Sequence, residues 1–278
     1  MIRTSRKCAG CSVLEAIFER ARNAGRAAFI PYVMAGDPDR ATTLAILGAL
    51  TQAGADIIEL GIPYSDPLAD GPTIAAAGQR ALAAGTTIAS TLELVREHHE
   101  HGGAPIVLFT YYNPVLQYGI DRFAREAAAA GACGAIVPDI ALEEGEALGA
   151  TLADNGLDMP LLVAPSTKAG RARRIAAQST GFIYVVSRLG VTGAGTQPST
   201  KALRTQIEML RAVTDAPLAV GFGVSHSDHV RRVAPLADGI IVGSALIDAY
   251  AGTRGEEAAQ RVRAFVEPLI AAANSVEV

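Results

Sequence analysis

The sequence predicts an α/β fold: a (β/α)8 TIM barrel with an extra N-terminal helix, formed by residues 13–278 as a single domain behind a flexible leader, residues 1–12. Eight short runs rich in Ile, Val and Leu alternate with Ala-rich amphipathic segments, and this alternation is typical of a parallel sheet covered by helices. Eight such units in one domain-sized chain favour a closed barrel over an open doubly wound sheet. No G-x-G-x-x-G motif follows the first strand, which argues further against a dinucleotide-binding fold.

The predicted strands read as nearly continuous apolar runs, as expected for parallel strands beneath helices. They span residues 27–34, 55–61, 105–111, 134–139, 160–165, 181–187, 216–222 and 238–243. The predicted helices between and after them span residues 39–54, 86–102, 121–131, 143–156, 200–213 and 256–273. A further helical pattern at residues 12–25 precedes the first strand, and we expect it to cap the barrel floor.

The composition indicates a large apolar core and a surface without a strong electrostatic field. Half of the 278 residues are apolar, 19% are charged, and the net charge is −4. A nearly neutral chain gives no basic surface for nucleic acid. No apolar run approaches the ~20 residues that a membrane span requires, and the basic leader precedes a charged amphipathic pattern rather than a signal peptide. We therefore expect a soluble cytoplasmic protein.

The cysteines predict neither a disulfide framework nor a metal centre. Cys8 and Cys11 form a C-x-x-C in the leader, but no second pair is present to complete a zinc tetrahedron, and Cys133 stands apart. We interpret the pair as incidental.

The stretch "ELGIPYSDPLADGP", residues 59–72, ends a strand on a carboxylate and continues into a rigid loop. Because side chains alternate along a strand, Ile58 and Leu60 share the apolar face under the helices, and Glu59 points into the barrel mouth. There, desolvation would raise its pKa toward neutrality and suit it to general acid/base work. Asp70, in a loop stiffened by three prolines, can reach the same cavity. The alternative for Glu59 is a structural role as a helix cap or salt-bridged rim residue.

Two other chemistries are conceivable for this site, a metal centre and a Schiff-base lysine. A metal centre would need a histidine or a third carboxylate at another strand end, and the five histidines are poorly placed for that. A Schiff-base aldolase would need a lysine in the barrel, but Lys168 lies beyond its strand, in the expected first turn of a helix. We therefore expect no metal and no Schiff base.

Glycine-rich segments near the last strands predict an anion site. "GFGVS" (221–225) and "VGSALI" (242–247) follow the seventh and eighth strands, and the second opens a short helix at Ser244. Barrels frequently bind phosphate there, through backbone amides such as those of Gly223 and Gly243. Ordinary tight turns are the alternative.

Two further features belong to the strand ends. The segment at residues 187–200 is long enough for a mobile lid, with a plain disordered loop as the alternative.

Aromatic residues at strand ends suggest a pocket for a flat apolar substrate, although such residues often belong to the core. They are Tyr32, Phe109, Tyr111, Tyr184 and Phe222.

The motifs "ELGIPYSDPLADGPTI", "PYVMAGDP", "FTYYNPVLQYG", "SRLGVTGAG", "GFGVS" and "VGSAL" occur together, and with them the chain resembles the α subunits of tryptophan synthase from about residue 13 onward. The resemblance implies a carbon–carbon lyase, which cleaves indole-3-glycerol phosphate to indole and glyceraldehyde 3-phosphate. It implies that Glu59 shuttles the proton and that Asp70 holds the indole N–H. Met34 departs from the family pattern, in which threonine is more common.

The resemblance also implies the remaining site residues and the partner. The phosphate ligands would be Gly193, Gly223, Gly243 and Ser244. The indole pocket would be formed by Tyr32, Ile74, Phe109, Tyr111, Ile136, Tyr184 and Phe222. Arg188 and Thr192 would lie in the mobile loop, and Ser65, Asp66 and Pro67 would face a β subunit. That partner would carry pyridoxal phosphate in an αββα heterotetramer, and this chain would need no cofactor of its own.

Two alternative functions share these features. A stand-alone lyase that releases free indole would use the same catalytic residues. A catalytically silent barrel that binds a phosphoester and regulates a partner would not need both Glu59 and Asp70, so the presence of both argues against it.

Overall fold

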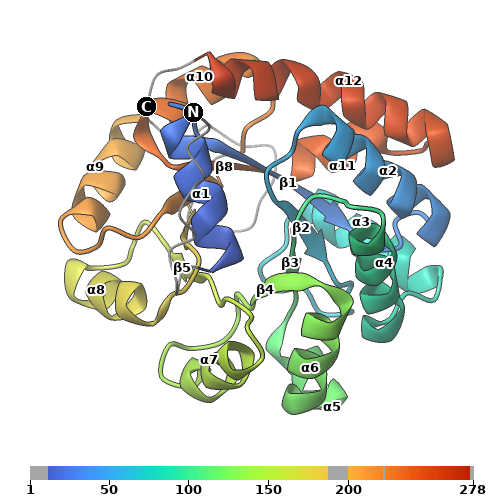
Figure 1. The fold of residues 1–278 in the computed structure, drawn as a ribbon, viewed down its shortest axis with the longest axis horizontal. Helices are drawn as coiled ribbons and strands as arrows, with labels where there is room; N and C mark the ends of the chain where they lie inside the picture. Colours follow the sequence, from blue (N-terminus) through green and yellow to red (C-terminus); the bar gives the residue numbers. More distant parts are fainter. Residues whose placement is uncertain (1–11, 187–199, 222, 276–278) are drawn as a thin grey trace, which may run out of the picture.

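The computed structural model describes residues 12–186, 200–221 and 223–275. Within them, eight parallel strands form one sheet in the order β4-β3-β2-β1-β8-β7-β6-β5, surrounded by helices (Figure 1). The strands are β1 (Ala28–Met34), β2 (Ile58–Gly61), β3 (Ile106–Phe109), β4 (Ala132–Ile136), β5 (Leu161–Val163), β6 (Ile183–Val186), β7 (Leu218–Gly221) and β8 (Gly239–Val242). Each lies within or beside one of the eight runs that the sequence predicts.

The two end strands of this order approach each other just before β5. Gly134 of β4 forms an isolated parallel bridge with Asp158. Around it, the Ala135 N–H donates to the Asp158 carbonyl at 2.9 Å, and the Asp158 N–H donates to the Cys133 carbonyl at 3.0 Å. The sheet is therefore a nearly closed barrel, as the sequence predicts.

The helices follow the predicted alternation, with additions at the loops. The predicted ones are α1 (Val13–Asn23), α2 (Arg40–Ala53), α4 (Ile88–Glu100), α6 (Ile120–Ala130), α7 (Gly145–Asp154), α9 (Thr200–Arg211), α11 (Ser244–Tyr250) and α12 (Gly255–Asn274). Four further helices lie outside the predicted ranges: α3 (Pro72–Ala83), α5 (Tyr112–Tyr118), α8 (Ala169–Gln178) and α10 (Ser227–Val233). Lys168 is the exposed residue just before α8, where a helix start was expected.

The apolar core has two layers. The outer layer lies between strands and helices and includes Ile58 and Leu60 of β2. The inner layer lies inside the barrel and includes Ile57, Val107 and Ile136. This division follows from strand alternation, because successive side chains point to opposite faces of a sheet.

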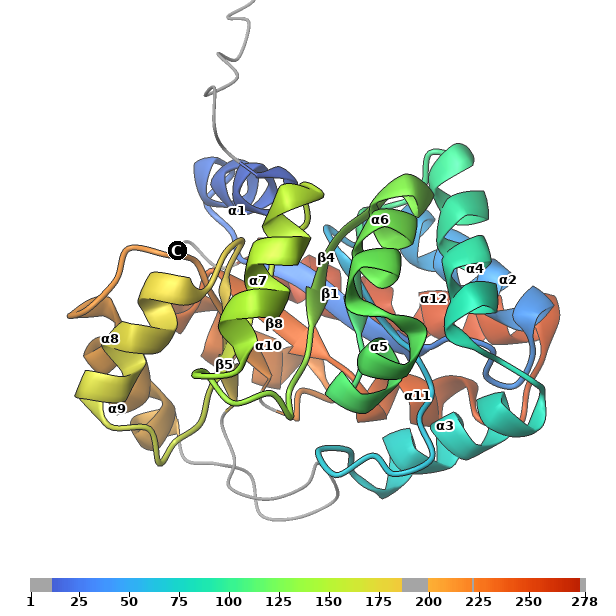
Figure 2. The same cartoon turned by 90° about the horizontal axis from the view of Figure 1, so that it is seen from below.

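Helix α1 closes one end of the barrel, as predicted. Its Leu14, Ile17 and Phe18 are buried in the inner layer with residues from the amino ends of the strands, and the Phe18 ring lies 5.4 Å from that of Phe182. A capping box begins the helix: the Glu15 N–H donates to the Ser12 hydroxyl, and the Ser12 N–H donates to the Glu15 carboxylate. Figure 2 shows α1 at one end of the barrel and α3 and α11 at the other.

Candidate active site

Strand β2 carries Glu59 into the carboxyl end of the barrel interior. Its neighbours Ile58 and Leu60 pack in the outer layer, so Glu59 takes the inward face, where it is only 2% exposed. In the sheet it is level with Tyr32 of β1 and Val107 of β3. Gly61, two residues later on the same face, leaves room for Tyr32, because a Cβ there would overlap the Tyr32 hydroxyl.

Asp70 approaches the same interior from the loop between β2 and α3. The loop closes on itself where the Asp70 N–H donates to the Pro67 carbonyl at 3.2 Å, and Pro72 then begins α3 with a proline in its first turn, where the missing N–H costs nothing. The Tyr111 hydroxyl accepts a hydrogen bond from the Ala69 N–H at 3.1 Å and also hydrogen-bonds the Asp70 carboxylate. Tyr111 therefore anchors the loop that carries Asp70.

The two carboxyl groups have different environments and interact with each other. Burial, followed by the charge of Asp70, raises the pKa of Glu59 to about 8. Burial also raises the pKa of Asp70, to about 6, although the hydrogen bond from Tyr111 works in the opposite direction. Near pH 7, Glu59 is therefore mainly the neutral acid and Asp70 mainly the anion.

Glu59 also holds an oxygen with no partner among the described residues. Its Oε2 is buried and makes no hydrogen bond there, and the hydroxyl of Thr110 is in the same condition. Buried polar atoms are normally hydrogen-bonded, so an orphaned carboxyl oxygen inside a barrel mouth indicates a group that acts on a ligand.

Aromatic side chains surround the two acids. The rings of Tyr32 and Phe109 meet edge to face at 5.8 Å, and those of Phe109 and Tyr111 at 6.4 Å. The charges of Asp70 and Glu59 help to raise the pKa values of Tyr32 and Tyr184, after burial as the main cause. Both tyrosines therefore lie close to both acids, and the surroundings of the two carboxyl groups are rich in aromatic rings.

Some of the other predicted site residues are placed by the structure, and the others lie outside the residues that it describes. Ile136 of β4 is level with Phe109 in the sheet. Gly243, just before α11 and Ser244, lies beside the pocket wall, since a Cβ there would be 3.7 Å from Cβ of Tyr32 and 3.8 Å from Cδ1 of Ile74. Gly223 has φ of +63°, a conformation that favours glycine. Outside the described residues lie Arg188, Thr192, Gly193, Phe222, Cys8 and Cys11.

The structure adds contacts that the sequence analysis missed. Tyr111 was predicted only as a pocket wall, and its hydrogen bond to Asp70 depends on how the loop folds back, which no local pattern reveals. The Tyr64 ring packs against Tyr111 at 5.4 Å; the only signal for it was an aromatic residue inside the carboxylate-rich loop. Among the described residues, no group of three His, Cys, Asp or Glu side chains could hold a metal ion.

Sequence comparisons identify the family. The family model described as tryptophan synthase alpha chain matches residues 18–274. The chain belongs to the tryptophan synthase alpha chain family. It is 48% identical over 252 residues to the tryptophan synthase alpha chain of Gloeobacter violaceus, covering 90% of this chain and 91% of the relative. It is 47% identical over 253 residues to that of a Picosynechococcus species, covering 91% and 96%.

Solved structures agree with this family assignment. A structure of Mycobacterium tuberculosis tryptophan synthase is 40% identical and superposes with a TM-score of 0.87, covering 95% of this chain and 99% of that one. The alpha subunit from Legionella pneumophila is 32% identical with a TM-score of 0.85, covering 95% and 98%.

Family membership confirms the resemblance seen in the motifs, and with it the activity. The chain is a carbon–carbon lyase of tryptophan biosynthesis, whose reaction is the cleavage of indole-3-glycerol phosphate to indole and glyceraldehyde 3-phosphate. In the described part of the chain, no helix has the length and apolar character needed to cross a membrane.

Proposed function

We propose that Glu59 moves the proton in this cleavage and that Asp70 stabilises the charge that develops on the indole ring. The observation that supports this most directly is the buried carboxyl group of Glu59 beside the half-buried one of Asp70, of which Glu59 has the higher pKa and an unpartnered oxygen. One group is suited to give and take a proton, and the other to remain an anion.

The reaction needs one proton to move between two substrate atoms. Neutral Glu59 donates a proton to indole C3, which gives the ring a positive charge that is shared with N1–H. Asp70 accepts a hydrogen bond from that N–H and stabilises the cation. The bond from C3 to the side chain then breaks, its electrons return to the ring, and the Glu59 carboxylate takes the proton of the 3′-hydroxyl as the aldehyde forms. Glu59 ends protonated, so the step balances without a cofactor of this chain.

The walls of the cavity suit the rest of the substrate. The flat indole ring would lie among Tyr32, Phe109 and Tyr184, with Ile74, Tyr111, Ile136 and Phe222 completing the pocket. The phosphate would bind the amides of Gly193, Gly223 and Gly243 and the start of α11 at Ser244. Arg188 and Thr192 would lie in the mobile loop, where Thr192 would help to order Asp70 when the loop closes.

The β subunit would bind the rim of the barrel near the Asp70 loop, in an αββα assembly in which it holds the pyridoxal phosphate. Ser65, Asp66 and Pro67 lie on this rim, and the next residue, Leu68, is 73% exposed. The amide of Asn113 in α5 donates to the Tyr64 hydroxyl at 3.1 Å, which joins this loop to α5, whose Leu116 is 46% exposed. Two exposed leucines on connected segments support a protein interface.

Indole release from indole-3-glycerol phosphate by the purified chain tests the proposal. Glu59→Gln retains the shape of the side chain but cannot shuttle a proton, so we expect turnover to fall at least a thousandfold while circular dichroism and the unfolding transition stay those of a folded barrel. Near-normal turnover in this variant would contradict the proton shuttle.

The same assay with and without a β subunit separates the alternatives. The chain of an αβ complex should be slow alone and strongly activated by the partner, whereas a stand-alone lyase should be equally fast in both conditions. A silent regulatory barrel would release no indole in either.

A further inference from the structure

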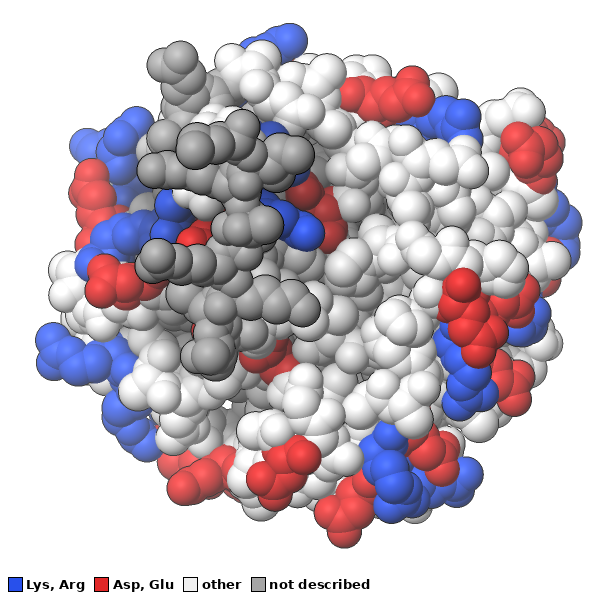
Figure 3. All heavy atoms as spheres, in the orientation of Figure 1, with Lys and Arg blue, Asp and Glu red and all other residues white. Residues whose placement is uncertain are grey.

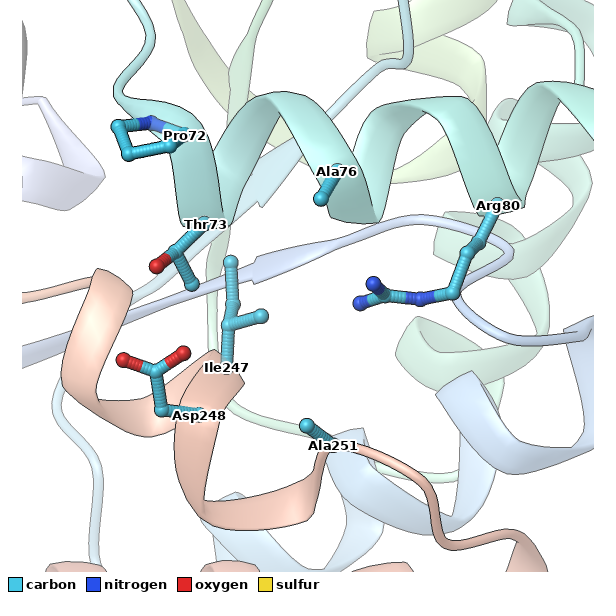
Figure 4. A pocket seen from close by; sticks show the side chains of 7 residues that line it. All are labelled: Pro72, Thr73, Ala76, Arg80, Ile247, Asp248 and Ala251. Atoms are coloured by element: carbon cyan, nitrogen blue, oxygen red, sulfur yellow. The ribbon is translucent and has the colours of Figure 1, made fainter.

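A second cleft lies between α3 and α11, and none of its lining residues belongs to the proposed active site. It has a volume of about 310 Å³, a size typical of small-molecule sites. Figure 4 shows that charged or polar groups lie at its two ends, with the side chains of Ala76, Ile247 and Ala251 between them.

Arg80 forms the basic end, and its guanidinium is held in place by a buried partner. Its Nε and Nη2 donate to the two carboxylate oxygens of Asp37 at 2.7 and 2.8 Å, and Asp37 is only 1% exposed. The Tyr250 hydroxyl donates to the same carboxylate at 3.2 Å. Nη1 makes no hydrogen bond with the described residues, and the guanidinium points into the cleft (Figure 4). One edge of a fixed guanidinium therefore remains open for an anionic group.

Asp248 of α11 forms the acidic end. It makes no ion pair or hydrogen bond within the part of the chain that the structure describes, and its carboxylate points toward the hydroxyl of Thr73 across the cleft (Figure 4). Ala76, Ile247 and Ala251 line the space between the two ends. A ligand that fits this lining has an ammonium group at one end, a carboxylate at the other and an apolar chain between them.

The two charged ends of the cleft do not contact each other. Thr73 and Arg80 are seven residues apart on α3, which is roughly 10 Å along the helix axis. Arg80 shortens this gap because helical side chains lean toward the N-terminus, but its open edge and Asp248 still do not approach to ion-pair distance. We propose that this cleft binds a linear ω-amino acid, with its carboxylate on Arg80 and its ammonium group on Asp248.

Four related small molecules test the proposal on the full chain, with binding followed by saturation-transfer NMR and by the shift in melting temperature. The probe is ε-aminocaproate. Norleucine is its isomer with both charges on one end, and caproate and hexylamine each carry only one of the two charges. We expect ε-aminocaproate to bind at least tenfold more tightly than the other three. Equal binding of norleucine, or no binding of ε-aminocaproate at millimolar concentration, would overturn the proposal.

Two variants locate the binding within the cleft. Asp248→Asn removes one charge-assisted contact and should weaken ε-aminocaproate about tenfold, and Ala76→Phe should abolish binding by filling the apolar middle. The control Asp121→Asn removes an exposed carboxylate from α6 and should change nothing. If Asp248→Asn binds as well as the unaltered chain, the site is not this cleft. Binding is measured without the cleavage reaction, so failure here leaves the proposed function untouched, and the reverse also holds.

Discussion

At the scale of single residues, Glu59 and Asp70 show how neighbouring positions in one barrel give the same functional group two different pKa values. Burial raises the pKa of both groups, but the hydrogen bond from Tyr111 lowers that of Asp70. Asp70 therefore loses its proton first, and its charge then raises the pKa of Glu59 further. The inward position of Glu59 follows from strand alternation and is visible in the sequence. The order of the two pKa values is not, because it depends on a loop contact with a tyrosine 41 positions further along.

The two pKa values predict a bell-shaped dependence of kcat/KM on pH. Asp70 must be ionised, so activity should be lost as the pH falls through about 6. Glu59 must be protonated, so activity should be lost as the pH rises through about 8. A rate profile from pH 5 to 10 checks this, and activity that keeps rising above pH 9 would show that Glu59 starts the reaction as a base.

Tyr111→Phe should move one limb of that profile. In the unaltered chain the Tyr111 hydroxyl lowers the pKa of Asp70, so its removal should shift the acid limb to higher pH. The phenylalanine ring should still pack against Phe109. An acid limb at an unchanged pH would mean that Tyr111 acts only as a wall of the pocket. Tyr118→Phe, in a tyrosine at the end of α5, is the matched control and should leave the profile unaltered.

At the scale of elements, the carboxyl end of β1 is tied to two helices by one buried carboxylate. Asp37 follows β1, and its partners Arg80 and Tyr250 belong to α3 and α11. These helices begin beside Asp70 and at Ser244, respectively. The contact therefore connects both ends of the proposed site.

Asp37→Asn should destabilise the protein by about 2 kcal/mol, because charge-assisted hydrogen bonds inside the fold are replaced by weaker neutral ones. The midpoint of urea unfolding measures this. The comparison is Glu97→Gln, which breaks an ion pair with Arg40 whose side chains are 39% and 49% exposed; it should cost less than about 1 kcal/mol. If both variants lost the same free energy of unfolding, the burial of Asp37 would not strengthen its ion pair.

The elements themselves were largely predictable. The strands were visible as apolar runs because both of their faces are buried, and long helices such as α2 and α12 were visible from their length and periodicity. Helix α3, "PTIAAAGQRALA", is rich in small residues and follows directly on the proline-rich loop, so its start is hard to see in the sequence. The seven-residue helices α5 and α10 are too short to show a period.

At the scale of the whole molecule, charged groups gather around the periphery in the view down the barrel, where Figure 3 shows mixed Lys, Arg, Asp and Glu at the outline and a largely uncharged surface further in. Figure 3 shows the face of the molecule that carries α1, and the net charge of −4 is small for a chain of 278 residues. Recognition of a partner by this molecule should depend on shape and apolar contact more than on long-range attraction.

Leu116→Asp should weaken binding to the β subunit and its activation of indole release, because it places a charge on an exposed apolar position of the proposed interface. The rate of the chain alone should be unchanged, since Leu116 does not line the cavity. Titration of β subunit against the rate gives both quantities, and Val13→Asp, at an exposed position on α1, is the control. Normal activation of Leu116→Asp would place the interface elsewhere.

Helix α1 makes the two ends of the barrel different. Leu14, Ile17 and Phe18 are buried among the amino ends of the strands, so α1 covers that end of the barrel. For the site proposed at Glu59, we expect the product to leave past the opposite rim. A protein seated there therefore meets the departing molecule first, before the surrounding water does.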